Sequence, residues 1–141
     1  MNKYLKALFI LSLASLFIYA GTIKAIDSQQ FFEDLKSFKL GSPHFLALTA
    51  VLLPYLEIFS GLALFIPKLR RGALSLIVLQ FFFFEIWLAQ AWARDLIQDC
   101  PCFGAKGVDI RIEFCINLFF MAIASLLFFN KKNDSDQPLN D

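Results

Sequence analysis

The chain has 141 residues, of which 58% are hydrophobic and 18 are Phe, and its mean hydropathy is +0.62. Soluble domains average about 45–50% apolar residues, so this excess predicts that lipid solvates most of the chain. A net charge of +1 argues against the basic surface that a nucleic-acid partner requires. His44 is the one histidine in the sequence, so a metal site built from a His/Cys cluster is not expected.

The first predicted membrane span covers residues 7–26 and follows a basic start. Its length is close to the roughly 20 residues that a membrane helix needs. A cleaved signal peptide ending near Ala20-Gly21 is the alternative, but the apolar stretch continues beyond these residues with one interruption at Lys24. We therefore expect a retained span. Polar residues recur on one helical face, which we expect to pack against other helices: Ser12, Ser15, Tyr19 and Thr22.

A short amphipathic helix on the membrane surface is predicted within residues 27–44. This segment is polar, but it carries four large apolar side chains at helical spacing: Phe31, Phe32, Leu35 and Phe38. Gly41-Ser42-Pro43 is a turn signal that ends this helix and begins the next span.

The second and third spans are predicted at residues 45–66 and 72–93, and each carries a carboxylate, Glu57 and Glu85. An acidic side chain at the bilayer centre costs about 2.5–3.5 kcal/mol on insertion scales, so we expect both to face the bundle interior. Their role is either packing, as neutral or paired groups, or function, as proton acceptors or contacts to a quinone headgroup.

The fourth span is predicted at residues 112–129, and residues 131–141 form a polar tail expected to be disordered. Residues 1–130 would thus be one all-α domain, a four-helix bundle of a polytopic membrane protein. The turn at residues 67–71 contains three cations, and two lysines follow the fourth span. Cations concentrate in cytoplasmic loops, so both termini are predicted in the cytoplasm and residues 94–111 outside, across a bacterial inner membrane.

The outer loop contains the sequence Asp99-Cys100-Pro101-Cys102-Phe103-Gly104. Residues two apart on an extended chain have Cα atoms roughly 6.6–7.2 Å apart, whereas a disulfide needs about 4.4–6.8 Å. A Cys100–Cys102 bond therefore requires a bend and should be strained, which favours an exchangeable redox couple. A permanent disulfide, two idle thiols and half of a metal site are the alternatives. Arg94 and Lys106 favour the thiolate, and Asp99 opposes it.

One further thiol, Cys115, lies in the first turns of the fourth span. It is expected to be a small packed residue, with a resolving thiol as the alternative.

Three segments in this order resemble the MauE branch of the MauE/DoxX family of bacterial membrane proteins. They are Phe17-Ile18-Tyr19-Ala20-Gly21-Thr22-Ile23-Lys24; Leu53-Pro54-Tyr55-Leu56-Glu57 with Gly61; and Arg94 followed by the Cys-Pro-Cys-Phe-Gly loop. Members of this family are redox-associated and often paired with a thioredoxin-like protein, and the name-giving member is implicated in maturing methylamine dehydrogenase. The resemblance thus implies a thiol–disulfide role. Because Lys24 and Glu57 both lie in the matching motifs, we also expect them to form an ion pair.

Together these features predict an integral membrane thiol–disulfide redox protein, a component of an oxidoreductase system. Cys100 and Cys102 would exchange electrons with an extracytoplasmic partner, thioredoxin-like or undergoing maturation. The binding or proton-coupled residues would be Glu57, Glu85, Lys24 and Arg94, with no metal and with quinone as the one cofactor considered. A non-enzymatic assembly factor, as in methylamine dehydrogenase maturation, is the main alternative. A small-solute transporter with its site at Glu57 and Glu85 is the third.

Overall fold

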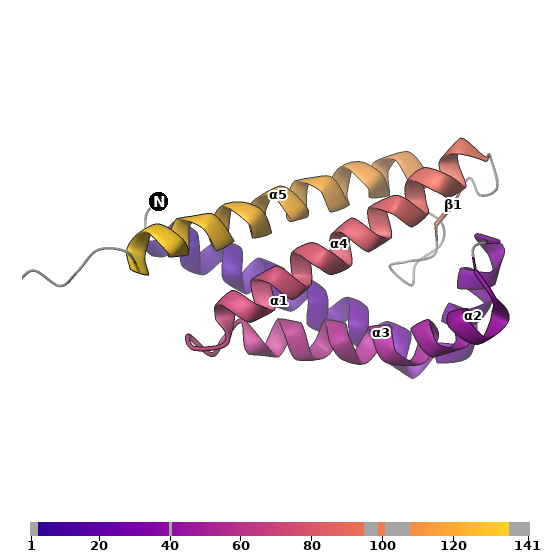
Figure 1. Ribbon diagram of the computed structural model, residues 1–141, viewed down its shortest axis with the longest axis horizontal. Coiled ribbons are helices and arrows are strands. Elements are labelled where there is room, and N and C mark those ends of the chain that lie inside the picture. The colour runs from indigo at the N-terminus through magenta and orange to yellow at the C-terminus, as the bar shows by residue number, and fades with distance from the viewer. Residues whose placement is uncertain (1–2, 40, 95–98, 101–107, 136–141) are drawn as a thin grey trace, which may run out of the picture.

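Four long apolar helices dominate the computed structural model, which describes residues 3–39, 41–94, 99–100 and 108–135 (Figure 1). The helices are α1 (Lys3–Ile26), α2 (Ser28–Ser37), α3 (Pro43–Ala63), α4 (Arg70–Ala93) and α5 (Ile110–Ser135). Two short strands, β1 (Asp99–Cys100) and β2 (Val108–Asp109), precede α5 in the sequence and pair antiparallel with each other.

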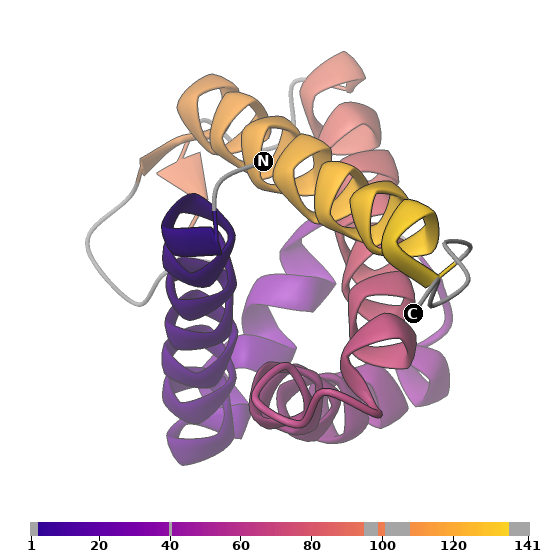
Figure 2. The same cartoon turned by 90° about the vertical axis from the view of Figure 1, so that its left-hand side faces the viewer.

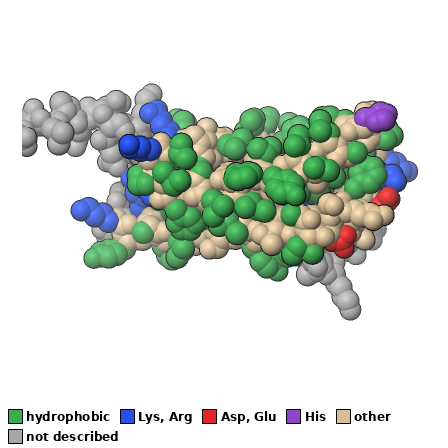
Figure 3. Space-filling view, turned by 90° about the horizontal axis from the view of Figure 1, so that it is seen from below, with side chains coloured by type: hydrophobic (Ala, Val, Ile, Leu, Met, Phe, Trp, Pro, Cys, Tyr) green, Lys and Arg blue, Asp and Glu red, His purple; other side chains and the backbone are tan. Residues whose placement is uncertain are grey.

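The predicted all-α bundle with four membrane spans is confirmed. The helices α1, α3 and α4 and residues 110–129 of α5 are long and apolar enough to cross a bilayer. Seen end-on, the four surround a common centre (Figure 2). Hydrophobic side chains cover most of the middle of the molecule, while charged side chains gather at its two ends (Figure 3). This distribution fits a hydrocarbon layer flanked by water.

The bundle consists of two helix pairs, because α1 packs mainly against α3 and α4 mainly against α5. Two cation–π contacts join α4 to α5 near the ends of the pair. The Arg71 guanidinium lies 5.5 Å from the Phe128 ring centroid, and that of Arg111 lies 5.9 Å from the Trp92 ring. Contacts between the two pairs, α1 with α5 and α3 with α4, are fewer.

The expected amphipathic helix is confirmed as α2, and it closes one end of the bundle. Asp27 caps it, since its carboxylate accepts a hydrogen bond from the Gln30 amide at 3.1 Å. Its apolar face packs inward, with Phe31 and Leu35 against α3 and Trp87. Phe38, directly after α2, packs against Leu88, Ala91 and Ile110 at the end of α4 and the start of α5. Both α2 and the β1–β2 pair thus lie at the same end (Figure 1).

The turn before α3 follows from its sequence. Gly41 has φ of +93°, a left-handed conformation that favours glycine. The Ser42 hydroxyl then accepts a hydrogen bond from the Phe45 amide at 3.4 Å, and Pro43 occupies the first helical turn.

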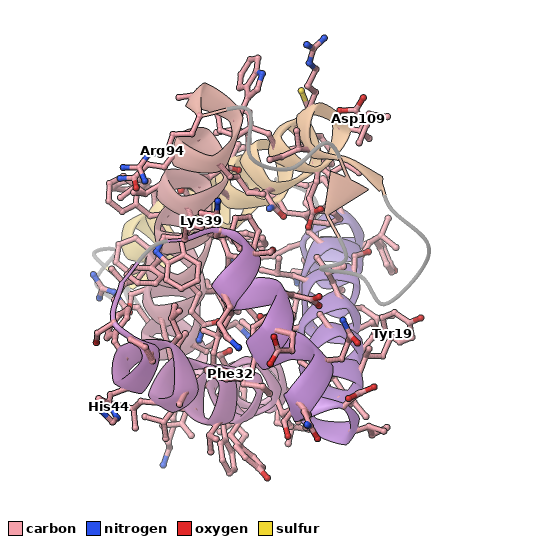
Figure 4. The ribbon with its side chains drawn as sticks, turned by 90° about the vertical axis from the view of Figure 1, so that its right-hand side faces the viewer. Tyr19, Phe32, Lys39, His44, Arg94 and Asp109 are labelled. Atoms are coloured by element: carbon pink, nitrogen blue, oxygen red, sulfur yellow. The ribbon has the colours of Figure 1, made fainter. Side chains whose placement is uncertain are left out.

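The polar face of α1 points away from the bundle, so the expectation that it packs against other helices is wrong. Ser12, Ser15, Tyr19 and Thr22 are all exposed, and Tyr19 projects outward (Figure 4). The Thr22 hydroxyl donates to the Ile18 carbonyl at 2.6 Å, so it needs no partner on another helix. The packed face instead carries apolar side chains and small residues: Leu13, Ala14, Phe17, Ala20 and Gly21.

Two glycines let α1 and α3 approach closely. A Cβ atom on Gly21 would lie 2.7 Å from the Pro54 carbonyl oxygen, and one on Gly61 would lie 2.9 Å from Ile18 Cγ1. The Pro54 carbonyl oxygen cannot move away from such a Cβ atom without shifting α3. Gly21 therefore fixes the separation of the two helices.

We expect Gly21→Ala to destabilise the protein by about 1–3 kcal/mol, the usual cost of overpacking, although alanine is the better helix former. Unfolding by sodium dodecyl sulfate in mixed micelles measures this loss. Gly72→Ala is the matched control, because a Cβ there meets nothing within 4 Å, and its stability should be unchanged or slightly higher. Equal stabilities of the two variants would show that the α1–α3 contact is looser than described.

Candidate functional site

A buried ion pair joins α1 to α3. Lys24 Nζ lies 2.7 Å from Glu57 Oε1, and the two residues are 7% and 3% exposed. The expected pairing is therefore confirmed. Two aromatic rings cover the ammonium group, with centroids 4.8 Å (Phe84) and 5.4 Å (Phe31) from Nζ, and such cation–π contacts gain strength when desolvated.

The local sequence explains how this pair forms. Lys24 lies in the last turn of α1, where a cation interacts favourably with the helix dipole. Glu57 shares the inner face of α3 with Ala50, Pro54 and Gly61, all buried. A buried ion pair is stable only when its remaining polar atoms are also satisfied. Glu57 Oε2, however, has no hydrogen-bond partner in the described part of the chain.

A cavity of about 40 Å³ lies beside this pair, and α5 completes its polar wall. Its polar lining is Lys24, Glu57, Glu113 and Asn117, and its aromatic lining is Phe17, Phe81 and Phe84. Neither Glu113 nor Asn117 was predicted from the sequence as a site residue. Their spacing of four residues, which places both on one face of a helix, is the signal that would have identified them.

The second predicted carboxylate, Glu85, also faces the interior, as expected, with 7% exposure. Neither of its carboxylate oxygens has a hydrogen-bond partner among the described residues. It interacts electrostatically with Glu113 across the α4–α5 pair. Gln80, another buried residue of α4, likewise has both amide atoms without a described partner. The buried polar cluster therefore includes all four spans.

The cavity does not fit the quinone headgroup considered as a ligand. An engineered cavity that binds benzene has a volume of about 150 Å³, whereas this one measures about 40 Å³. A polar cavity of this size instead accommodates water, which needs about 10–15 Å³ of accessible volume and two to four polar partners.

Arg94 does not join this cluster. It is exposed directly after α4, where its backbone amide donates to the Gln90 carbonyl at 3.2 Å. Its side chain lies at the edge of the molecule, on the other side from Asp109 (Figure 4). The structure thus gives Arg94 no contact with Glu57 or Glu85.

The Cys-Pro-Cys motif is described only in part. The backbone of Cys100 lies in β1, where it is in register with Val108, and Asp99 is in register with Asp109. The side chain of Cys100 and the whole of Cys102 lie outside the described residues. Asp109 Oδ1 accepts a hydrogen bond from the Arg111 amide at 2.9 Å, so β2 leads directly into α5.

Cys115 is exposed, and the expectation of a packed thiol is wrong. It lies on the outer side of α5 in a shallow apolar groove with Arg111, Ile112, Ile116 and Phe119. The inward positions of this part of α5 are taken by Glu113 and Asn117, so Cys115 faces the lipid instead.

The fold and the buried cluster define a polytopic four-helix membrane protein with an ion pair in its interior. The family described as methylamine utilisation protein MauE matches residues 2–130. The chain therefore belongs to the MauE family, as its motifs indicated. No curated protein and no solved structure gives a significant match.

We expect Lys24→Met to destabilise the protein by about 3–5 kcal/mol, because it leaves a buried carboxylate without its counterion. The double variant Lys24→Met/Glu57→Met should recover most of this loss, since it removes both charges. Denaturation in mixed micelles gives the three free energies of unfolding.

The exposed pair Lys36–Glu33, with Nζ and Oε1 3.1 Å apart, provides the control. Lys36→Met should cost no more than about 1 kcal/mol. A Lys24→Met variant as stable as Lys36→Met would contradict the structural importance of the buried pair.

Proposed function

We propose that this protein is a membrane thiol–disulfide redox protein that exchanges electrons with an extracytoplasmic protein through Cys100 and Cys102. The observation that carries the proposal is the β1–β2 pair. It holds the Cys100 backbone beside Val108 and immediately before α5, at the end of the bundle where a soluble partner has access. Membership of the MauE family and the Cys-Pro-Cys spacing support the same assignment.

The exchange proceeds in two balanced steps. The thiolate of Cys100 attacks a sulfur of the partner disulfide, whose S–S bond breaks as a mixed disulfide forms. The Cys102 thiolate then attacks the Cys100 sulfur and releases the second thiol of the partner. Two electrons pass from the Cys100–Cys102 dithiol to the partner, and the reverse sequence oxidises a partner dithiol. The relative reduction potentials determine the direction of net flow.

The distribution of charge supports an extracytoplasmic location for the thiol loop. The beginning of α1, the turn between α3 and α4 and the end of α5 lie at one end of the bundle, and α2 and β1 lie at the other (Figure 1). The first of these ends carries Lys68, Arg70 and Arg71 in one short turn, as cytoplasmic loops do. The thiols would then lie in the oxidising compartment, where disulfides form.

We expect Cys100 and Cys102 to form a reversible couple with a potential of about −120 to −230 mV, the range of exchange-active disulfides. Titration against glutathione buffers, read by thiol alkylation and mass spectrometry, measures this potential. Cys102→Ser should leave Cys100 able to hold a partner as a mixed disulfide.

Cys115→Ser is the control for this titration. Cys115 is exposed on the lipid-facing side of α5, and its removal should leave the couple intact. Thiols that stay reduced in oxidising buffer, or a bond that persists below about −300 mV, would contradict the redox function. An assembly factor that acts without thiol chemistry would then be the better assignment.

The orientation predicts which end of the bundle is labelled from outside. In a cysteine-free background, Ser28→Cys at the start of α2 should react with an impermeant maleimide in intact spheroplasts. Leu69→Cys, an exposed position in the turn before α4, should react only after the membrane is opened. The opposite pattern would place the thiol loop in the cytoplasm.

A further inference from the structure

A shallow groove runs along the outer, lipid-facing side of α5, which forms one side of the ring of helices in Figure 2. Two rows of side chains at a spacing of four residues, the ridges of a helix surface, form its walls: Arg111, Cys115 and Phe119 in one row, and Ile112, Ile116 and Phe120 in the other. Cys115 is the smallest of these side chains, so its row is indented at the middle. The Cys115 side chain is exposed, and the indentation is therefore open to the membrane.

The length of the groove matches the depth of one lipid leaflet. Arg111 lies in the first turn of α5, where the apolar span of this helix begins. Phe119 follows eight residues later, about 12 Å along the helix axis. One leaflet contributes half of the hydrocarbon core, which is about 30 Å thick. An acyl chain that starts at the level of Arg111 would therefore lie along the whole groove.

Arg111 lies at the depth where lipid headgroups are expected. Its guanidinium is 5.9 Å from the ring centroid of Trp92, an exposed residue in the last turn of α4. Tryptophan at the end of a span is typical of the membrane–water interface. Arginine at this level lays its apolar stem along the lipid and keeps its charge in the headgroup region.

The charge of the groove favours an anionic ligand. Arg111 is the one charged residue among the described side chains that line it. Asp109 is not part of this lining, and its Oδ1 accepts a hydrogen bond from the Arg111 backbone amide at 2.9 Å. A guanidinium binds a phosphate group through two parallel hydrogen bonds. In a zwitterionic lipid the headgroup cation offsets the charge of the phosphate, so an anionic lipid is attracted more strongly.

We propose that this groove binds one anionic phospholipid, with its phosphate on the Arg111 guanidinium and an acyl chain between the two rows as far as Phe119. The phosphate neutralises the cation at the membrane surface, and the chain fills the indentation at Cys115. The site uses neither Cys100 nor Cys102. It is therefore independent of the proposed thiol exchange, and the failure of one proposal leaves the other intact.

Preferential binding is measured by the quenching of tryptophan fluorescence with brominated lipids. Trp92 lies next to the site, and Trp87→Phe removes the signal of the other tryptophan, which is buried. In phosphatidylcholine vesicles, brominated phosphatidylglycerol should quench Trp92 with about fivefold higher relative affinity than brominated phosphatidylcholine. This ratio corresponds to about 1 kcal/mol, the attraction of one cation to an anionic membrane surface. Equal quenching by the two lipids would overturn the proposal.

Arg111→Gln should lower this affinity ratio to about one, because it removes the group that binds the phosphate. Arg94→Gln is the matched control. It removes an exposed guanidinium from the same end of the bundle, but Arg94 does not line the groove, so the ratio should be retained. An equal decrease in both variants would indicate attraction to the surface charge in general and would overturn a site at Arg111.

The position of the acyl chain is tested at Cys115, the single thiol that remains in a Cys100→Ser/Cys102→Ser background. Phosphatidylglycerol should slow its alkylation by a lipid-soluble maleimide several-fold relative to pure phosphatidylcholine. Arg111→Gln should remove this protection, and Arg94→Gln should preserve it. Equal alkylation rates in the two lipids would overturn the placement of the chain in the groove. This comparison does not require the Trp87→Phe variant, so it remains decisive if that variant fails to fold.

A second copy of the chain is the alternative occupant of this face of α5. It would protect Cys115 equally in both lipids and would bring two Cys115 side chains close enough for an oxidative cross-link. A cross-linked dimer in phosphatidylglycerol vesicles would therefore overturn the lipid site. Protection that depends on the lipid, in a protein that forms no such dimer, is the expected result.

Discussion

An ammonium and a carboxylate 2.7 Å apart inside an apolar bundle determine much of what surrounds them. Removing both charges from water costs several kcal/mol per ion, and only close contact with further polar or aromatic groups offsets that cost. Gly21 brings α1 against α3 at the level of Glu57, and α2 places the Phe31 ring over the ammonium. The tight helix pair, the closing helix and the polar cavity are all arranged around this one contact.

The ion pair lies within one helix pair, and the remaining buried carboxylates lie within the other. Lys24 and Glu57 belong to α1 and α3, while Glu85 and Glu113 belong to α4 and α5. The cavity lies where the two pairs meet, and contacts there are fewer than within each pair. Close packing therefore preserves each half, and the polar cavity lies at the boundary between them.

Hydropathy was sufficient to predict the four spans and α2, because apolar length and helical spacing are local properties of the sequence. The pairing of Lys24 with Glu57 was expected only because both residues lie in the family motifs, and the structure confirms it. Glu113 was missed because a carboxylate in the first turn of a span resembles an ordinary interfacial residue. The outward direction of Cys115 depends on which face of α5 meets α4, and a single sequence does not carry that information. The β1–β2 pair is too short to show alternation.

The division into two helix pairs has a consequence for biosynthesis. The segment α1–α2–α3 emerges first and contains both members of the ion pair, so its charges can neutralise each other before α4 is made. The later segment, α4 to α5, brings two carboxyl groups and no described cation among its buried residues. The first three helices can therefore enter the lipid with the charges of their ion pair already matched.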